Sequence, residues 1–183
     1  MQKLGRMLLG IVLGLGLLAG RSVAEAHTMT LEERTIIVVK ADGGKAEIKP
    51  GNPLSEVSDA LGSDYELKDF GGDGIRMASY IYGNKYNFYA RTFKNDVRAA
   101  EELKLTGYSI KDGSVETLSG IKVGMLYREV VDKFGPGEEL NSRYEKNDGT
   151  IKYIYDLYNG VRELSFKVDG EGKIQEIEFR QEM

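Results

Sequence analysis

The sequence predicts an α+β protein made of two tandem repeats, in each of which a short helix, or a helix pair, packs on one face of an antiparallel β-meander. Residues 48–62 and 121–135 are identical at seven of fifteen positions in a chain of 183 residues. Both segments have apolar residues at helical spacing, and both are followed by alternating apolar and polar runs with turn signals between them. We therefore divide the chain into an export signal (1–26), a first repeat with an extra N-terminal strand (27–117) and a second repeat (118–183).

The first 26 residues have the pattern of a secretory signal peptide. Lys3 and Arg6 precede an apolar run, and Ala24-Glu25-Ala26 has the small residues of a cleavage site, so the mature chain is expected to begin at His27. A membrane anchor is the alternative, but glycines interrupt the run and it is shorter than the ~20 residues of a spanning helix. The chain has no cysteine to acylate, so we expect no lipid anchor and a periplasmic or secreted bacterial product without disulfides.

Each repeat is expected to begin with a short amphipathic helix. The apolar positions of these helices are Leu54, Val57 and Leu61 in the first repeat and Tyr127, Val130 and Phe134 in the second. Gly62 and Gly135 stand where a left-handed C-terminal residue is needed. Asn52-Pro53 predicts an N-cap and a proline at the first helical position. The second helix has no comparable cap, so its start should fray more.

A β-hairpin and a third strand are expected after each helix. The hairpin turns are Gly83-Asn84 and Asn159-Gly160, and Asn-Gly between alternating runs is a strong hairpin signal. The third strands are expected around residues 103–110 and 174–180, and residues 35–39 read as the extra strand. The flanking apolar positions are Ile75, Met77, Ile81, Phe88, Ala90 and Thr92 in the first repeat and Ile151, Tyr153, Tyr155, Leu157, Leu164, Phe166 and Val168 in the second.

The alternation of these runs assigns faces to the tyrosines. Tyr153 and Tyr155 are expected in the core beneath the helix, whereas Tyr80 and Tyr82 are expected on the opposite face. A constant offset of 73 residues between the repeats would instead match Tyr80 with Tyr153. We prefer the alternation, because a slip of one residue turns every side chain to the other face.

The motifs resemble a known group of bacterial envelope domains. A helix opened by "IKxG(M)xxxEVxxxxG" and a meander ending in "FxVDGEGKIQEIEF" are similar to the SmpA/OmlA outer-membrane lipoprotein domain and to the β-lactamase-inhibitor-protein-like domains, and residues 120–181 match better than the first copy. The resemblance implies helices packed on one face of an antiparallel sheet, in tandem copies. The usual Gly-Met-Thr of these families is replaced by Gly124-Met125-Leu126 and Gly51-Asn52-Pro53, and the lipoprotein cysteine is absent.

The composition offers little for catalysis or metal binding. The chain has no cysteine, and its one histidine, His27, lies beside the expected cleavage site, so Ser-His-Asp and Cys-His arrangements are excluded from a rigid core. Zinc and other transition metals lose their preferred ligands for the same reason. Removal of residues 1–26 leaves 22 basic and 28 acidic residues, a balance that disfavours nucleic acid. We predict no enzyme activity, no cofactor and no metal.

When helices cover one face of an antiparallel sheet, the other face remains open. This open face is the candidate binding surface. Tyrosine and arginine are typical of protein-interaction hot spots. The candidate residues expected there are Arg76, Tyr80, Tyr82, Tyr89, Arg91, Lys152, Tyr158 and Lys167. Tyrosine is also favoured in exposed strands for cross-strand packing, which is the alternative explanation.

Two functions follow from these observations. The first is an exported, non-enzymatic protein-binding module that meets an unidentified envelope or extracellular protein through its open sheet face, with inhibition of that protein as one expected role. The second is an envelope structural or assembly factor of the SmpA/OmlA type.

Overall fold

Two antiparallel sheets and two α-helices make up the part of the chain that the computed structural model describes, residues 29–40, 42–140 and 149–182. The helical elements are η1 (Leu31–Arg34), α1 (Ser55–Leu61), η2 (Ala100–Glu102) and α2 (Tyr127–Phe134), where η marks a 3-10 helix. The strands are β1 (Ile36–Val39), β2 (Lys45–Ile48), β3 (Glu66–Gly72), β4 (Ile75–Tyr82), β5 (Tyr86–Phe93), β6 (Gly107–Ile110), β7 (Val115–Thr117), β8 (Glu138–Leu140), β9 (Ile151–Tyr158), β10 (Arg162–Val168) and β11 (Ile174–Gln181). The protein is therefore α+β with a small helical content, and the expected signal peptide and His27 lie outside the described residues.

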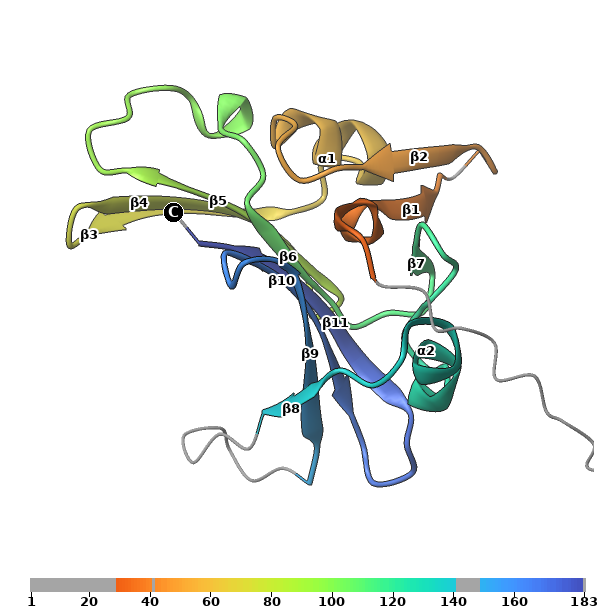
Figure 1. The fold of residues 1–183 in the computed structure, drawn as a ribbon. Coiled ribbons are helices and arrows are strands. Elements are labelled where there is room, and N and C mark those ends of the chain that lie inside the picture. The colour runs from red at the N-terminus through yellow and green to blue at the C-terminus, as the bar shows by residue number, and fades with distance from the viewer. Residues whose placement is uncertain (1–28, 41, 141–148, 183) are drawn as a thin grey trace, which may run out of the picture.

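The larger sheet has eight strands in the order β3-β4-β5-β6-β11-β10-β9-β8 (Figure 1). We call α1 with β3–β6 the N-terminal half and α2 with β8–β11 the C-terminal half. The halves join where β6 pairs with β11, with Ile110 opposite Ile177. The sheet is thus continuous from one half to the other, and the boundary expected at 117/118 falls at the end of β7.

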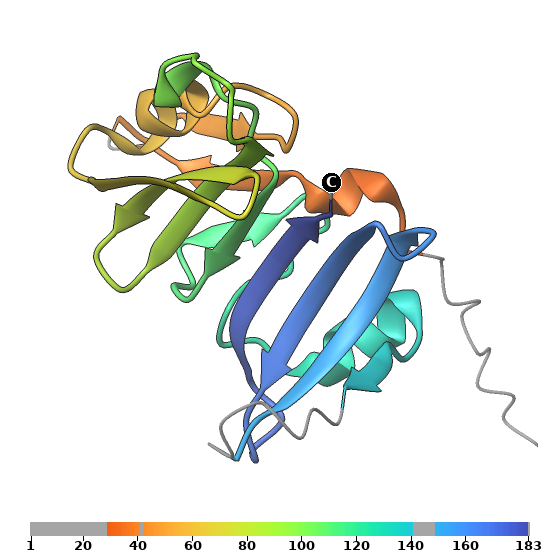
Figure 2. The same ribbon diagram turned by 90° about the vertical axis from the view of Figure 1, so that its left-hand side faces the viewer.

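The second sheet has the order β2-β1-β7 and lies with α1 and α2 on one side of the eight-stranded sheet (Figures 1 and 2). Ile36 and Val38 of β1 are buried, as are Val57 of α1 and Val130 of α2. The hydrophobic core therefore lies between the eight-stranded sheet and this covering layer. The opposite face of the large sheet, which we call the open face, is turned to the viewer in Figure 2.

Aromatic rings carry the core across the junction of the two halves. Phe88 on β5 lies 6.3 Å from Tyr108 on β6, and Tyr108 lies 5.8 Å from Phe179 on β11, measured between ring centroids. All three side chains are fully buried. The Tyr108 hydroxyl donates to the carbonyl oxygen of Arg34 at 2.9 Å, so its one polar group is satisfied.

Neither α1 nor α2 begins with a side-chain N-cap, although the sequence suggested Asn52 as the cap of α1. α1 starts at Ser55 rather than at Pro53, and the residue before it is Leu54. Asn52 instead donates from its side-chain amide to the Glu56 carboxylate at 2.6 Å. At the start of α2, Glu129 accepts a hydrogen bond from the backbone N–H of Leu126 at 3.3 Å. The residue before α2 is Leu126, so the expected lack of a polar cap there is confirmed, and the greater fraying of this helix start stays a prediction.

The register of the first hairpin corrects the expected faces of β4. Tyr82 pairs with Tyr86 across a three-residue loop, residues 83–85, where a two-residue turn was expected. The extra residue shifts the pairing by one, so Tyr80 lies opposite Phe88 and shares its face. Tyr80 is 2 % exposed and belongs to the core. The assignment of Tyr80 and Tyr82 to the open face was therefore wrong.

The second hairpin also has a three-residue loop, which shifts the pairing of β9 with β10 by one residue. A β-bulge then shifts the pairing back. Arg162 pairs with Tyr158, and the register then changes so that Glu163 pairs with Asp156. Tyr153 and Tyr155 consequently share the face of Phe166 and pack against the core. One bulge explains why the alternation gave the correct faces in β9 and the wrong ones in β4.

Four strands were not expected from the sequence. β3 and β8 form the edges of the large sheet, and β2 and β7 flank β1 in the small one. β3 was hidden because Gly71-Gly72-Asp73-Gly74 has the composition of a loop, yet its first two glycines end a strand. β7 and β8 are three residues each, too short to show a period.

Candidate binding groove on the open sheet face

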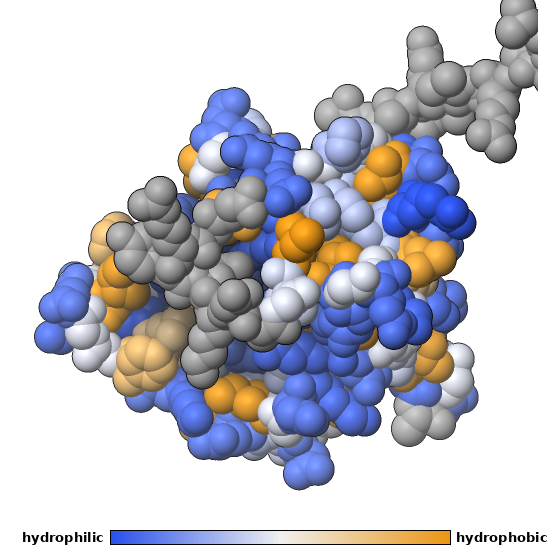
Figure 3. Space-filling view, turned by 90° about the horizontal axis from the view of Figure 1, so that it is seen from below, coloured by the Kyte–Doolittle hydropathy of each residue, from blue (hydrophilic) through white to orange (hydrophobic). Residues whose placement is uncertain are grey.

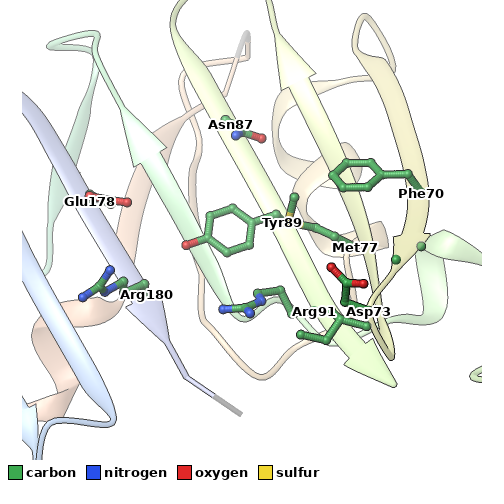
Figure 4. A pocket seen from close by; sticks show the side chains of 11 residues that line it. Phe70, Asp73, Met77, Asn87, Tyr89, Arg91, Glu178 and Arg180 are labelled. Carbon is green, nitrogen blue, oxygen red and sulfur yellow. The ribbon is translucent and has the colours of Figure 1, made fainter. Parts of the chain in front are cut away.

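A groove of about 620 Å³ lies on the open face. Its walls come from β3, β4 and β5 of the N-terminal half and from β11 of the C-terminal half, as Figure 4 shows. The side chains that define it are Phe70, Met77, Tyr89, Arg91, Glu178 and Arg180. The groove thus crosses the junction between the two halves.

Tyr89 forms the floor of the groove because β6 carries no side chain beneath it. A Cβ atom on Gly107 would lie 2.3 Å from the Tyr89 ring and 2.6 Å from the carbonyl oxygen of Phe179. The ring therefore lies flat across β6, and its hydroxyl comes within 3.4 Å of that same carbonyl on β11. A glycine at position 107 is what permits an aromatic from β5 to reach β11.

The environment of Tyr89 raises the pKa of its hydroxyl above the ordinary tyrosine value near 10. Burial of the ring, and then the nearby carboxylate of Glu178, raise the pKa of Tyr89 to about 12. Arg180 and Arg91 act in the opposite direction but do not cancel this effect. Tyr89 therefore offers a neutral aromatic surface at physiological pH.

Ion pairs cover the C-terminal half of the open face. Lys152 on β9 contacts Glu178 on β11 at 2.6 Å, and Arg180 contacts Glu163 on β10 at 2.9 Å. Lys167 lies opposite Glu176 in the register of β10 and β11. These charges are largely neutralised within the sheet itself.

The N-terminal half of the open face is more apolar. Phe70 on β3 is 55 % exposed, and Phe93, which follows Tyr89 and Arg91 at alternate positions of β5, is 69 % exposed. Ile75 and Met77 are half-buried on the same face. Seen from below, hydrophobic side chains form separate small groups among polar ones (Figure 3).

Arg91 differs from the other cations of this face. Among the described residues its guanidinium has no hydrogen bond or ion pair, although its backbone N–H donates to Thr106 at 2.9 Å. Figure 4 shows the Arg91 side chain next to Tyr89 within the groove. The groove therefore combines an unpaired guanidinium with aromatic and apolar walls.

The structure places four of the eight candidate residues on the open face: Tyr89, Arg91, Lys152 and Lys167. Arg76 instead shares the core side of β4 with Tyr80, beyond the end of the core. Its guanidinium contacts the Asp69 carboxylate at 2.5 Å and donates to the carbonyl oxygens of Asp96 and Arg98. The Arg76 side chain therefore stabilises the loop that contains Asp96 and Arg98.

Tyr82 and Tyr158, which were also expected on the open face, have structural contacts instead. Tyr82 packs against the core and donates from its hydroxyl to the carbonyl oxygen of Gly62 at 2.9 Å. Tyr158 stands at the end of the β9–β10 hairpin, 57 % exposed, with the Arg162 guanidinium 5.4 Å from its ring centroid. It does not line the groove.

Sequence reasoning missed the apolar part of the groove. Phe70 lies in β3, a strand that was not expected from the sequence, and Met77 was grouped with the apolar positions of the hairpin and not with the open face. Gly107 gave a usable signal, because a glycine inside a strand flanked by aromatic strands often marks a close approach. Glu178 and Arg180 became relevant only through the pairing of β11 with β6.

Metal binding and membrane spanning are two further properties on which the described residues bear. In those ranges no three His, Cys, Asp or Glu side chains are grouped as a metal ion would require. None of the described helices has the length and apolar character needed to span a bilayer.

Comparison with known proteins gives two distant structural likenesses. No protein-family model matches the chain, and no curated protein matches it. The crystal structure of a DUF4309 family protein (YjgB) from Bacillus subtilis is 18 % identical, with 71 % of this chain and 78 % of that chain covered and a TM-score of 0.40. The uncharacterized protein YfeY from Escherichia coli is 13 % identical, with 73 % and 92 % covered and a TM-score of 0.35. Neither is described as SmpA/OmlA or β-lactamase-inhibitor-like, and at these scores neither supports a functional argument.

Proposed function

We propose that this chain is an exported, non-enzymatic protein-binding module, and that the N-terminal half of its open sheet face contacts a partner protein. One observation carries the proposal: Phe70 and Phe93 are exposed beside the guanidinium of Arg91, which has no ion pair within the described part of the chain. Aromatic residues and arginine are enriched among interface hot spots, where a desolvated ring or a newly paired guanidinium contributes most.

The proposed partner site differs in part from the one that the sequence suggested. Tyr89 and Arg91 remain in it, and Phe70 and Met77 join them. Lys152 and Lys167 lie further along the same face, and Lys152 is already paired with Glu178 there. Arg76, Tyr80, Tyr82 and Tyr158 are not part of the proposed site.

We also propose that the two halves are tandem repeats of one helix-plus-meander unit. Each half has a helix followed by four antiparallel strands, and the strand order reads symmetrically about the β6–β11 pair. The hydroxyl of Tyr82 donates to the carbonyl oxygen of Gly62, and that of Tyr155 donates to the carbonyl oxygen of Gly135. Tyr155 follows Tyr82 by 73 residues, and Gly135 follows Gly62 by the same number, which is also the spacing between the two helices. The alternation of the strands had argued against a constant offset of 73 residues, but these two hydrogen bonds support it and therefore the repeat.

Photo-crosslinking tests the proposed function. A photoreactive phenylalanine analogue placed at Phe70 is expected to give a discrete adduct in an extract of the source cells. Excess unlabelled protein should compete for the adduct, whereas the Arg91→Gln variant should compete poorly. The same analogue at Arg128, exposed on α2, is the control and should give no adduct. Equal adducts from both positions, or equal competition by Arg91→Gln, would contradict the proposal.

The adduct would also separate two roles for such a module. An enzyme in the adduct whose activity falls on binding would make the protein an inhibitor. An outer-membrane assembly component would favour the SmpA/OmlA-type role, for which the motif at residues 120–135 is the supporting observation. The proposed export is tested by N-terminal sequencing of the mature product, which should start at His27.

A further inference from the structure

The groove on the open face has a shape and charge that fit one kind of partner segment. We infer that it receives an extended peptide of about six residues in which one acidic side chain lies next to a large apolar side chain. This inference rests on the proposed function of the open face, and it specifies what part of the partner is bound. The acidic side chain pairs with Arg91, and the apolar one packs against Phe70 and Met77.

The charge preference follows from how the ionic groups around the groove are satisfied. Arg180 already contacts Glu163 at 2.9 Å, and Glu178 already contacts Lys152 at 2.6 Å. Arg91 has no such partner among the described residues. A carboxylate can form two parallel hydrogen bonds with a guanidinium, so an acidic side chain gains most at this position.

A second acidic group close by would be disfavoured. Asp73 lies at the β3–β4 end of the groove, and no other described residue neutralises its carboxylate. Like charges near one another cost free energy in a partly desolvated site. The groove therefore favours a single acidic residue within an apolar segment over a polyacidic tail.

The length of the groove indicates a peptide rather than a small metabolite. Its lining runs from β3 to β11, five neighbouring strands of the sheet. With about 4.8 Å between strands, this is roughly 19 Å. An extended chain covers that distance with about six residues at roughly 3.3 Å each. A pocket for a small ligand usually buries roughly 70–90 % of the ligand surface. This groove is open to solvent and would leave most of the surface of a small ligand exposed.

The direction of the groove also decides how a peptide would be held. The groove crosses the strands on the face of the sheet, so the backbone groups of β4, β5 and β6 are already paired with neighbouring strands. A bound segment therefore cannot extend the sheet, and recognition depends on side chains.

Three fluorescein-labelled heptapeptides test this inference by fluorescence anisotropy with the purified protein. The acidic probe is Gly-Ser-Phe-Glu-Leu-Ser-Gly. The basic probe has lysine in place of glutamate, and the polar probe has serine in place of phenylalanine and leucine. We expect the acidic probe to bind at least about tenfold more tightly than either of the others, the size of effect typical of a hydrogen bond to a charged group.

Matched variants locate the binding. Arg91→Gln should weaken binding of the acidic probe about tenfold, whereas Arg128→Gln removes the same charge on the helix side and should leave it unchanged. Phe70→Ser should weaken it as well. Val97→Ser, which removes an apolar side chain that is 95 % exposed outside the groove, is its control and should have no effect.

Several outcomes would overturn the inference without touching the proposed function. Equal binding of the acidic and basic probes would remove the charge preference. Binding of decanoate that is lost in Arg91→Gln, with no heptapeptide bound, would make the occupant a small amphipathic anion instead. No binding of any probe, together with a specific adduct from position 70, would mean that the partner uses a folded surface. Absence of both the adduct and probe binding would reject the proposed function itself.

Discussion

The two halves of the protein have similar core faces and different open faces. On the core side, Tyr65 stacks on Tyr80 with 4.0 Å between ring centroids, and Tyr127 stacks on Tyr153 at 4.1 Å. On the open side, the N-terminal half has exposed aromatics and an arginine, Arg91, with no ion pair to any described residue, whereas the C-terminal half has a set of ion pairs. Close packing restricts the side chains on the core face much more than those on the open face.

This difference indicates where function can be added to such a scaffold. A residue in contact with the core can change only if its neighbours change with it. A residue on the open face contacts few others, so a substitution there costs little stability. We therefore expect substitutions on the core face to change stability in both halves, and substitutions on the open face to change binding in the N-terminal half alone.

The largest expected effect comes from truncating the stacked tyrosines. Tyr80→Ala removes a ring that is 2 % exposed and should lower the free energy of unfolding by about 3–5 kcal/mol, the range for deleting a buried aromatic. Tyr153→Ala removes a half-buried ring and should cost less, about 2 kcal/mol. Urea denaturation of both variants measures the two values. A larger loss for Tyr153→Ala would invert the assignment of faces.

The next effect concerns the glycine beneath Tyr89. Gly107→Ala should destabilise the protein by about 1–3 kcal/mol, because its Cβ would meet both the Tyr89 ring and the backbone of β11. It should also weaken binding of the acidic heptapeptide, since the groove floor is displaced. Gly170→Ala, outside the groove and at a position where a Cβ meets nothing within 4 Å, is the control for thermal melts and binding. Equal behaviour of the two variants would contradict the proposed role of Gly107.

Removing single hydroxyl groups gives a smaller effect that compares the halves directly. Tyr82→Phe loses the hydrogen bond to Gly62 and should cost about 1 kcal/mol. Tyr155→Phe loses the bond to Gly135 and also a contact with the Tyr127 hydroxyl at 3.0 Å, so it should cost about 2 kcal/mol. Chemical denaturation measures both. If neither substitution changes stability, these hydrogen bonds do not hold the helices to the sheet.

The smallest expected difference is in acid stability. Hydrogen bonds from Ser114 lower the pKa of Asp112 to about 2, and the Arg76 guanidinium lowers the pKa of Asp69. A carboxyl with a lowered pKa in the folded state adds stability above its unfolded value near 4, and this stability is lost as the pH falls toward about 2. Asp112→Asn should therefore flatten the loss of stability between about pH 4 and pH 2 relative to the native protein. Denaturation midpoints measured across this range that fall equally steeply in both proteins would exclude this contribution.

The sequence predicted the helices and hairpins well because their signals are local. Gly62 and Gly135 have φ of 87° and 76°, as expected for residues that end a helix. The tyrosine faces of β4 could not be predicted in the same way. Both hairpins have three-residue loops, and only the second has the bulge at Arg162 and Glu163 that restores the alternation. The loops differ in sequence, Gly83-Asn84-Lys85 against Asn159-Gly160-Val161, but the bulge lies beyond the second loop, in the pairing of β9 with β10.

The groove was predicted only in part for a different physical reason. Tyr89 and Arg91 were identified because they alternate with the core residues Phe88 and Ala90 on one strand. Glu178 and Arg180 reach the groove through β6–β11 pairing, which joins residues about 70 positions apart and leaves no local pattern. Long-range pairing of this kind becomes visible only in the folded chain.

The most direct test of the central claim is amide chemical-shift mapping of the protein during titration with the acidic heptapeptide. If the N-terminal half of the open face is the binding surface, the perturbed amides should lie on β3, β4 and β5 and on the adjoining part of β11, and they should stop moving at one common peptide concentration. The Arg91→Gln variant should require about tenfold more peptide to reach the same shifts. Perturbations centred on β9 and β10, or on α1 and α2, would contradict the claim.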